Sequence, residues 1–149
     1  MYSNILVAVE NSDADRTVLD HVQRLARLTG ASLLLVHVAD GWVARNYEEL
    51  TLRESEEIKD DRAYLDRITA DLAGRGFAVR ARLAMGDPAK ELVRVANEEH
   101  VDLIAMSTHG HRFLNDLLRG STADRVRHNV TVPVLMIRAQ AVEKQQPEC

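Results

Sequence analysis

The chain has 149 residues, 46% of them hydrophobic, which suits one globular domain with a packed core. Its 19 Lys and Arg and 23 Asp and Glu give a net charge of −4 with both signs interspersed, so no basic stripe is available for a nucleic-acid backbone. The opening MYSNILVAVE has no basic n-region, and its apolar run is too short for a signal peptide or membrane span. The single cysteine, Cys149, excludes an internal disulfide. We therefore expect a cytoplasmic protein that binds neither nucleic acid nor membrane.

Five short runs of residues predict β-strands. Three of them, ILVAV, LLLVHV and LIAM, are nearly continuous in apolar residues, which is typical of parallel strands buried on both faces. The run AVRARL alternates instead, which predicts a strand with one wet face at a sheet edge. In chain order the predicted strands span residues 5–9, 32–38, 78–83, 102–106 and 134–138.

Helical patterns lie between the strands. Ser12 and Asp13 are placed to start the first helix, and Gly30 follows its last turn, where a left-handed cap is common. The second helical pattern stops at Gly74, and its polar leading part, residues 48–57, suits either an exposed helix start or a mobile flap. The apolar faces consist of Leu19, Val22, Leu25, Ala26 and Thr29 in the first pattern, and Ile58, Leu65, Ile68 and Leu72 in the second.

The third helical pattern has the clearest start signal. Asp87 stands at the N-cap and Pro88 at the first helical position. A fourth pattern, TADRVRHN, occupies residues 122–129. The predicted buried face of the third helix consists of Ala89, Leu92, Val93 and Ala96. Strands alternating with helices predict an α/β fold with a mostly parallel sheet, helices on both faces, and ligands bound beyond the carboxyl ends of the strands.

One segment at a predicted strand end has features of a phosphate site. In STHGHRFLNDLLRGST, residues 107–122, Gly110 and Gly120 allow tight backbone turns, and Ser121 and Thr122 open a helix whose N–H groups would face an anion. The alternative is an ordinary turn glycine with Ser121 as a helix cap, and spacing alone favours that alternative. The segment matches neither the Walker motif nor G-x-G-x-x-G.

Taken together, ILVAVENSD, LLLVHV, GDP and MSTHGHRFLNDLLRGST followed by VPVLMIR resemble the universal stress protein family over residues 3–138. The most specific part is the family's nucleotide-binding pattern G-x2-G-x9-G-S/T. Gly110, Gly120 and Ser121 match that pattern in spacing, whereas Ser107 stands at its first glycine. The resemblance implies a single Rossmann-like domain with sheet order 3-2-1-4-5, covering residues 1–140. The polar residues 141–149 are expected to form a disordered tail.

The resemblance also implies a binding site for ATP, or for AMP or ADP, with Mg²⁺. By family correspondence, Ala8, Val9, Glu10 and Val38 flank adenine and ribose, Met106 and Ser107 line the base side, and Gly110, Gly120, Ser121 and Thr122 hold the phosphates. Besides Ser107, the chain departs from the family at Glu10, where an Asp is common.

No arrangement of residues identifies a catalytic centre. His109 and His111 flank Gly110 without further metal ligands nearby, and His37 is interpreted as a hydrogen-bonded core or interface residue. Glu10, Asp13 and Asp40 are alternative carboxylates for a phosphate-bound Mg²⁺. We expect at most slow ATP hydrolysis or self-phosphorylation, for which Ser121 and Thr122 would be the nearest acceptors.

The last strand, with its flank at residues 132–138, lies at a sheet edge in the implied order. An exposed apolar edge favours pairing with a second copy, so a homodimer is expected there, and Pro133 suits a position outside the strand ladder. Three hypotheses follow: a nucleotide-dependent stress-response module, a dimeric interaction protein of the same fold that has lost the nucleotide, and an ATP-dependent enzyme. The third ranks last because no general base or nucleophile can be named.

Overall fold

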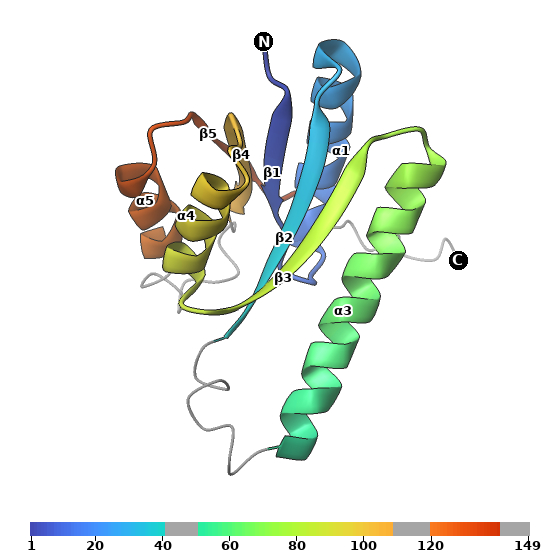
Figure 1. Ribbon diagram of the computed structural model, residues 1–149, viewed down its shortest axis with the longest axis vertical. Helices are drawn as coiled ribbons and strands as arrows, with labels where there is room; N and C mark the ends of the chain where they lie inside the picture. Colours follow the sequence, from blue (N-terminus) through green and yellow to red (C-terminus); the bar gives the residue numbers. More distant parts are fainter. Residues whose placement is uncertain (41–50, 109–119, 141–149) are drawn as a thin grey trace, which may run out of the picture.

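The computed structural model describes residues 1–40, 51–108 and 120–140. It contains one parallel sheet of five strands in the order β3-β2-β1-β4-β5, which confirms the predicted fold class and order (Figure 1). The strands are β1 (Asn4–Ala8), β2 (Ser32–Asp40), β3 (Val79–Gly86), β4 (Leu103–Thr108) and β5 (Val134–Arg138). The predicted tail, residues 141–149, lies outside the described residues.

The strands differ from the predicted ones mainly at their carboxyl ends. The hydrogen-bonded ladder between β2 and β3 continues to Asp40 and Gly86, and that between β4 and β5 continues to Thr108 and Arg138. The residues added are Ala39 and Asp40 in β2, Ala84 to Gly86 in β3, and Ser107 and Thr108 in β4, because backbone pairing does not depend on side-chain hydropathy. By contrast, β1 ends at Ala8, so the central strand is short at this edge.

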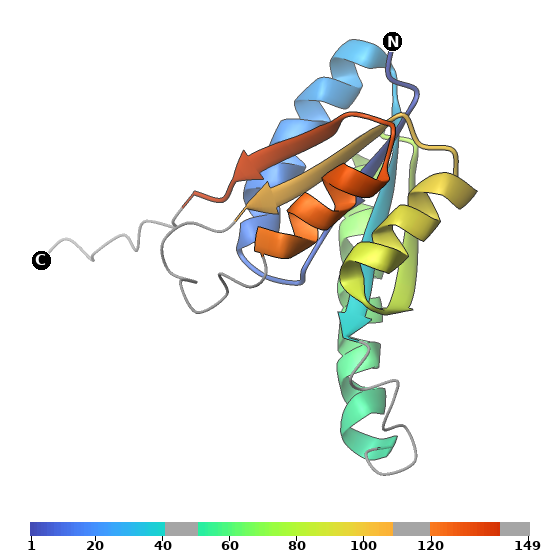
Figure 2. The same ribbon diagram turned by 90° about the vertical axis from the view of Figure 1, so that its left-hand side faces the viewer.

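Two helices cover each face of the sheet (Figures 1 and 2). On one face α1 (Ala14–Thr29) and α3 (Thr51–Gly74) pack on a cluster that includes Ile5, Val7 and Leu35. On the other face α4 (Pro88–Glu98) and α5 (Gly120–Asn129) pack on a cluster that includes Leu6, Val36 and Ile104. Successive strand residues therefore point to opposite faces, and both faces are apolar because both are buried.

The helix termini carry the predicted signals. Gly30 adopts φ 73° and donates its N–H to the Ala26 carbonyl at 2.8 Å, which closes the C-terminus of α1. Asp87 caps α4 by accepting the Lys90 N–H at 3.0 Å, and Pro88 follows it.

The prediction of the buried face of α4 was wrong at one position. Val95 is fully buried and Val93 only partly buried, because the face that meets the sheet runs through Ala89, Leu92, Val95 and Ala96. In the polar segment at 48–57 the structure is helical from Thr51, which favours the helix start over the flap. None of the helices in the described part of the chain is long and apolar enough to cross a membrane.

Candidate functional site

At the carboxyl edge of the sheet, the central strand β1 ends earlier than its neighbours β2 and β4. The last pairs of β1 are Ala8 with Val36 on one side and Val7 with Ala105 on the other. Beyond them β2 pairs only with β3 and β4 only with β5. The strand order reverses between β1 and β4, so the early end of β1 lies at this reversal. Open parallel sheets bind ligands at such a position.

The described site residues predicted from the sequence gather at this edge. Val38 lies near the end of β2, and α5 runs back from this edge because it leads through residues 130–133 to the start of β5 (Figure 2). The N-terminus of α5 therefore lies at the same edge as the end of β1. The residues at the edge are Ala8, Val9 and Glu10 at the end of β1, Val38 in β2, Met106 and Ser107 in β4, and Gly120, Ser121 and Thr122 in α5. Gly110, His109 and His111 lie outside the described residues.

The two residues predicted for the base side point to opposite faces of the sheet. Met106 belongs to the apolar cluster under α4 and α5. Ser107, the next residue, is 9% exposed, and its Oγ is buried with no hydrogen-bond partner in the described part of the chain. A buried hydroxyl without a partner costs free energy, and within the described residues the Ser107 hydroxyl at the end of β4 is such a group.

Asp15, in the first turn of α1, organises the segment after β1. It is 1% exposed, and its carboxylate accepts the N–H groups of Glu10 and Asn11 at 2.8 Å each and of Ser12 at 3.3 Å. The Tyr64 hydroxyl of α3 donates to the same carboxylate. Burial, and then this hydrogen bond to Asp15, raise the pKa of Tyr64, which keeps the phenol protonated and donating.

Sequence reasoning did not find Asp15. It placed the start of α1 at Ser12 and Asp13, and Asp13 is indeed the N-cap residue. The Asp13 side chain makes no capping bond, however, and the Ser12 hydroxyl accepts the Ala14 N–H at 3.3 Å. A possible signal was the position of Asp15 itself, an acidic residue in the first turn of a helix and a few residues after a buried strand.

His37 is the second buried polar residue at this edge. It is 8% exposed, with Nδ1 2.9 Å from the Val9 carbonyl oxygen and Nε2 3.1 Å from Oδ2 of Asp61 in α3. Oδ1 of Asp61 accepts from the Asn11 side-chain amide at 3.0 Å. His37 is thus the hydrogen-bonded core residue that the sequence predicted, and it joins the ends of β1 and β2 to α3.

An ion pair fixes α5 beside α4. The Arg125 guanidinium donates to both carboxylate oxygens of Asp87 at 3.1 and 2.9 Å. Together with the Lys90 N–H, which contributes less, it lowers the pKa of Asp87. Asp87 therefore serves as the N-cap of α4 and as the anchor for α5, whose N-terminus reaches the carboxyl edge.

The described residues contain no group of three or more His, Cys, Asp or Glu placed to hold a metal ion by themselves. Glu10 and Asp13 are exposed near the end of β1.

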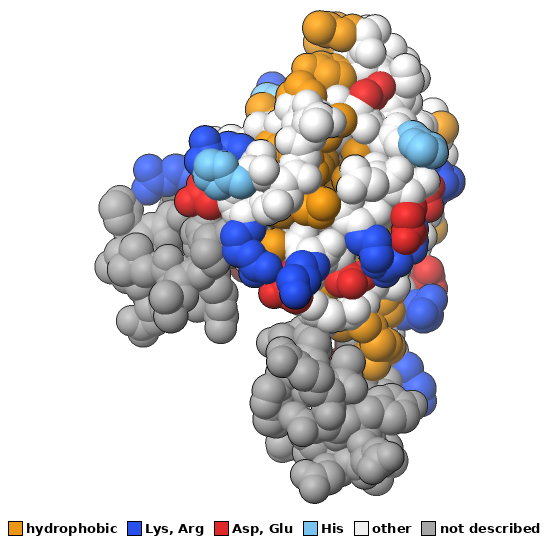
Figure 3. Space-filling view, turned by 60° about the vertical axis from the view of Figure 1, so that its left-hand side comes forward, with side chains coloured by type: hydrophobic (Ala, Val, Ile, Leu, Met, Phe, Trp, Pro, Cys, Tyr) orange, Lys and Arg blue, Asp and Glu red, His pale blue; other side chains and the backbone are white. Residues whose placement is uncertain are grey.

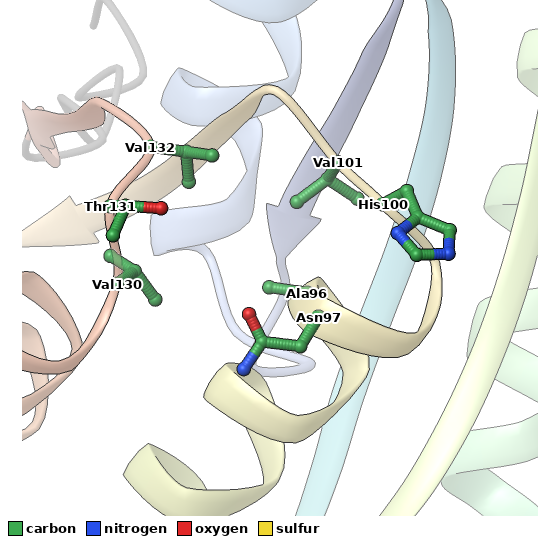
Figure 4. Close-up of a pocket in the computed structure, with 7 residues that line it drawn as sticks. All are labelled: Ala96, Asn97, His100, Val101, Val130, Thr131 and Val132. Atoms are coloured by element: carbon green, nitrogen blue, oxygen red, sulfur yellow. The ribbon is translucent and has the colours of Figure 1, made fainter.

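A separate pocket of about 260 Å³ lies at the opposite, amino edge of the sheet (Figure 4). It is open to solvent and lies between the end of α4, the turn before β4 and the segment before β5. Its lining residues are Ala96, Asn97, His100, Val101, Val130, Thr131 and Val132. None of these lining residues is a predicted site residue, and none of them is Asp, Glu, Lys or Arg, so we place the candidate site at the carboxyl edge instead.

Charges of both signs are intermixed on the side of the molecule shown in Figure 3. Among the described residues, Arg80 and Arg82 of β3 pair with Glu98 and Glu99 at the end of α4, at 2.6–3.3 Å. The Arg side chains of the edge strand thus have acidic partners on the neighbouring helix, which explains the polar positions in its sequence.

Comparison with known proteins agrees with this architecture. The universal stress protein family matches residues 1–138. Universal stress protein MJ0577 of Methanocaldococcus jannaschii is 28% identical, with 93% of this chain and 96% of that protein aligned. Its solved structure has a TM-score of 0.79 and covers 95% of this chain and 99% of its own.

Two further structures share the fold and contain nucleotides. A universal stress protein from Archaeoglobus fulgidus in complex with dAMP is 24% identical, with a TM-score of 0.67, and 91% of this chain and 98% of that chain are covered. A universal stress protein in complex with cAMP is also 24% identical, with a TM-score of 0.65 and coverage of 93% and 98%. From the family match and the shared fold, the chain belongs to the universal stress protein family.

Proposed function

We propose that the chain binds an adenine nucleotide, ATP in the first place, at the carboxyl edge between β1 and β4. In this proposal it acts in the cytoplasm as a nucleotide-dependent stress-response module. The observation that carries the proposal is the convergence of the end of β1, the end of β4 and the N-terminus of α5 at the point where the strand order reverses.

Each part of a nucleotide has a suitable counterpart at this edge. Val38, which is only partly buried near the end of β2, offers apolar surface to a base, and Glu10 is an exposed carboxylate within reach of a ribose hydroxyl in the proposed pose. The N–H groups at the start of α5, from Gly120 to Thr122, carry the partial positive charge of a helix N-terminus, which favours phosphate.

Mg²⁺ fits the proposal as a companion of the phosphates. It would neutralise phosphate charge and take one or two protein oxygens, for which Glu10, Asp13 and Asp40 are the candidates at this edge. The proposal also draws support from the dAMP and cAMP complexes, because those proteins have the same fold.

The test begins with the protein as purified. Denaturation followed by analysis of the released small molecules is expected to yield an adenine nucleotide. Titration of ATP with Mg²⁺ into the stripped protein is expected to show saturable binding. If no nucleotide is released and no binding occurs up to about 1 mM ATP, equivalent to only about 4 kcal/mol, the proposal is wrong.

That negative outcome would favour a dimeric interaction protein of the same fold. Its supporting observation is Ser107, a buried residue with a Cβ and a hydroxyl where the family pattern has glycine. Sustained multiple-turnover hydrolysis would instead indicate an enzyme. Phosphate transfer to the protein that disappears when Ser121 and Thr122 are both replaced by Ala would indicate self-phosphorylation.

We also propose a homodimer through β5. The strand lies at the edge of the sheet, and Met136 within it is 45% exposed. Antiparallel pairing with the same strand of a second copy would satisfy the free backbone groups of this edge and cover Met136.

A further inference from the structure

The end of β1 is held mainly by side chains from other elements. Asp15 of α1 accepts hydrogen bonds from the backbone of the segment at residues 9–12. Asp61 and Tyr64 of α3 act on this segment indirectly, through the side chains of Asn11, His37 and Asp15. In the sequence, α3 was only a charged helix with no part in the site. In the structure its middle turns lie against the segment that carries Val9 and Glu10 (Figure 1).

Asp61 makes two contacts at once, one from each carboxylate oxygen. Oδ1 accepts from the Asn11 amide at 3.0 Å, and Oδ2 lies 3.1 Å from Nε2 of His37. The Asp61 side chain is 19% exposed, and that of His37 is 11% exposed. The contact between Asp61 and His37 is therefore shielded from water more than an ordinary surface ion pair, which contributes little, whereas the contact with Asn11 is exposed.

His37 connects Asp61 to β1 through a second hydrogen bond. A carbonyl oxygen can only accept, so Nδ1 of His37 must donate to the Val9 carbonyl, at 2.9 Å. The Val9 N–H in turn donates to the Val36 carbonyl at 2.9 Å. Val9 is thereby bound on both sides, and one of these bonds depends on an imidazole that Asp61 orients.

Asn11 needs support because of its backbone. Its φ of 60° lies in the left-handed region, which costs free energy for residues other than glycine, although Asn tolerates it best. This conformation turns the chain immediately after Glu10. Asp15 accepts the N–H of Asn11, and Asp61 accepts from its side chain, so the turn is held from two helices.

We propose that Asp61 is a positioning residue of the nucleotide site, which sets Val9, Glu10 and Asn11 through its contacts with Asn11 and His37. The proposal rests on the proposed function, since it assigns α3 the task of fixing the base and ribose end of that site. Asp61 itself does not touch the nucleotide.

Two substitutions at the same position separate positioning from simple loss of charge. Asp61→Ala removes both contacts. Asp61→Asn can keep both, because the amide oxygen still accepts from Asn11 and the amide N–H₂ donates to Nε2 of a neutral His37 whose proton is on Nδ1. We expect Asp61→Ala to weaken ATP binding about tenfold and Asp61→Asn to stay within about threefold of the wild type.

Two control variants lie on the same helix. Asp60→Ala removes an exposed carboxylate next to Asp61 and is expected to leave the affinity unchanged. Leu72→Ala removes a side chain that is 2% exposed near the end of α3, so it destabilises the fold away from the site. If Asp61→Ala binds ATP like Asp60→Ala, or if Leu72→Ala weakens binding as much, Asp61 does not position the site.

Amide exchange in the nucleotide-free protein provides an independent readout. In Asp61→Ala the N–H groups of Glu10, Asn11 and Ser12 should exchange about tenfold faster than in the wild type, relative to the core amide of Leu35. Unchanged rates would overturn the inference. If the wild-type protein binds no nucleotide, the proposed function fails, and these rates still decide whether Asp61 positions the segment.

Discussion

Ser107 places a hydroxyl where it finds no partner among the described residues. Because an unsatisfied buried polar group costs about 1–3 kcal/mol, Ser107→Ala should raise the free energy of unfolding by about 1 kcal/mol. Urea denaturation of the nucleotide-free protein measures this change.

A second strand serine serves as the control. The Ser32 hydroxyl donates to the Ser3 carbonyl at 3.1 Å, so Ser32→Ala removes a satisfied group and should give no gain in stability. A loss of stability in Ser107→Ala would mean that its hydroxyl has a partner after all.

Asp15 is the residue on which the segment after β1 most depends. Asp15→Asn replaces an acceptor of three backbone N–H groups and a phenol by a group that presents its own N–H donors to them. We expect a loss of about 2–4 kcal/mol in the free energy of unfolding at pH 7. Chemical denaturation is the measurement.

The matched control for Asp15 is Asp20→Asn on the same helix. Asp20 is exposed, so its substitution should change stability by less than about 0.5 kcal/mol. Equal effects of the two substitutions would show that the Asp15 contacts do not stabilise the fold.

At the level of the elements, Asp87 joins two helices. Asp87→Asn keeps a good N-cap and loses the charge opposite Arg125, whereas Asp87→Ala loses both. The Ala variant should therefore be less stable than the Asn variant by about 1 kcal/mol, as measured by thermal unfolding. If the two variants unfold alike, the cap contributes nothing.

The contribution of the Asp87 ion pair should depend on pH in a defined direction. Its pKa is lowered in the folded state, first by the Arg125 guanidinium, so the folded protein favours the ionised form. The stabilisation is present above the ordinary Asp pKa of about 4 and is lost as the pH falls through the lower folded value. The stability difference between wild type and Asp87→Asn should accordingly shrink below about pH 4, and a difference that grows there would contradict the assignment.

At the level of the whole molecule, the proposed homodimer depends on the edge strand β5. We expect a dimer at micromolar concentration in analytical ultracentrifugation. Met136→Asp should shift it to a monomer, because like charges would face each other across the two-fold axis. Met85→Asp, at a similarly exposed position on the opposite edge strand β3, is the control and should remain dimeric. A wild-type monomer would overturn the dimer proposal.

Most of the fold could be predicted from the sequence because its signals are local. Continuous apolar runs such as ILVAV mark buried parallel strands, and Gly30 and Asp87 mark helix ends through their own backbone chemistry. The neighbours of each strand came from the family resemblance, since periodicity does not order strands.

The support of the candidate site could not be predicted in the same way. Its contacts join residues far apart in the chain, such as Asp15 with Tyr64 and Asn11 with Asp61. In the sequence, Asp61 and Tyr64 are two residues of a charged helix and differ in no local feature from their neighbours. Only the packing of α3 on the sheet separates the Asp61 carboxylate, which contacts Asn11 and His37, from the carboxylates of α3 that face water.

The all-parallel sheet also governs how the chain reaches its native state. No two neighbouring strands are joined by a hairpin, and β1 finds its second neighbour only when Ile5 pairs with Leu103. Strands this far apart in the sequence pair slowly, because the chain between them must lose the entropy of loop closure before the contacts can form. The candidate site lies between β1 and β4, at this pairing of large sequence separation, so a chain in which only the first three strands had assembled would lack the site.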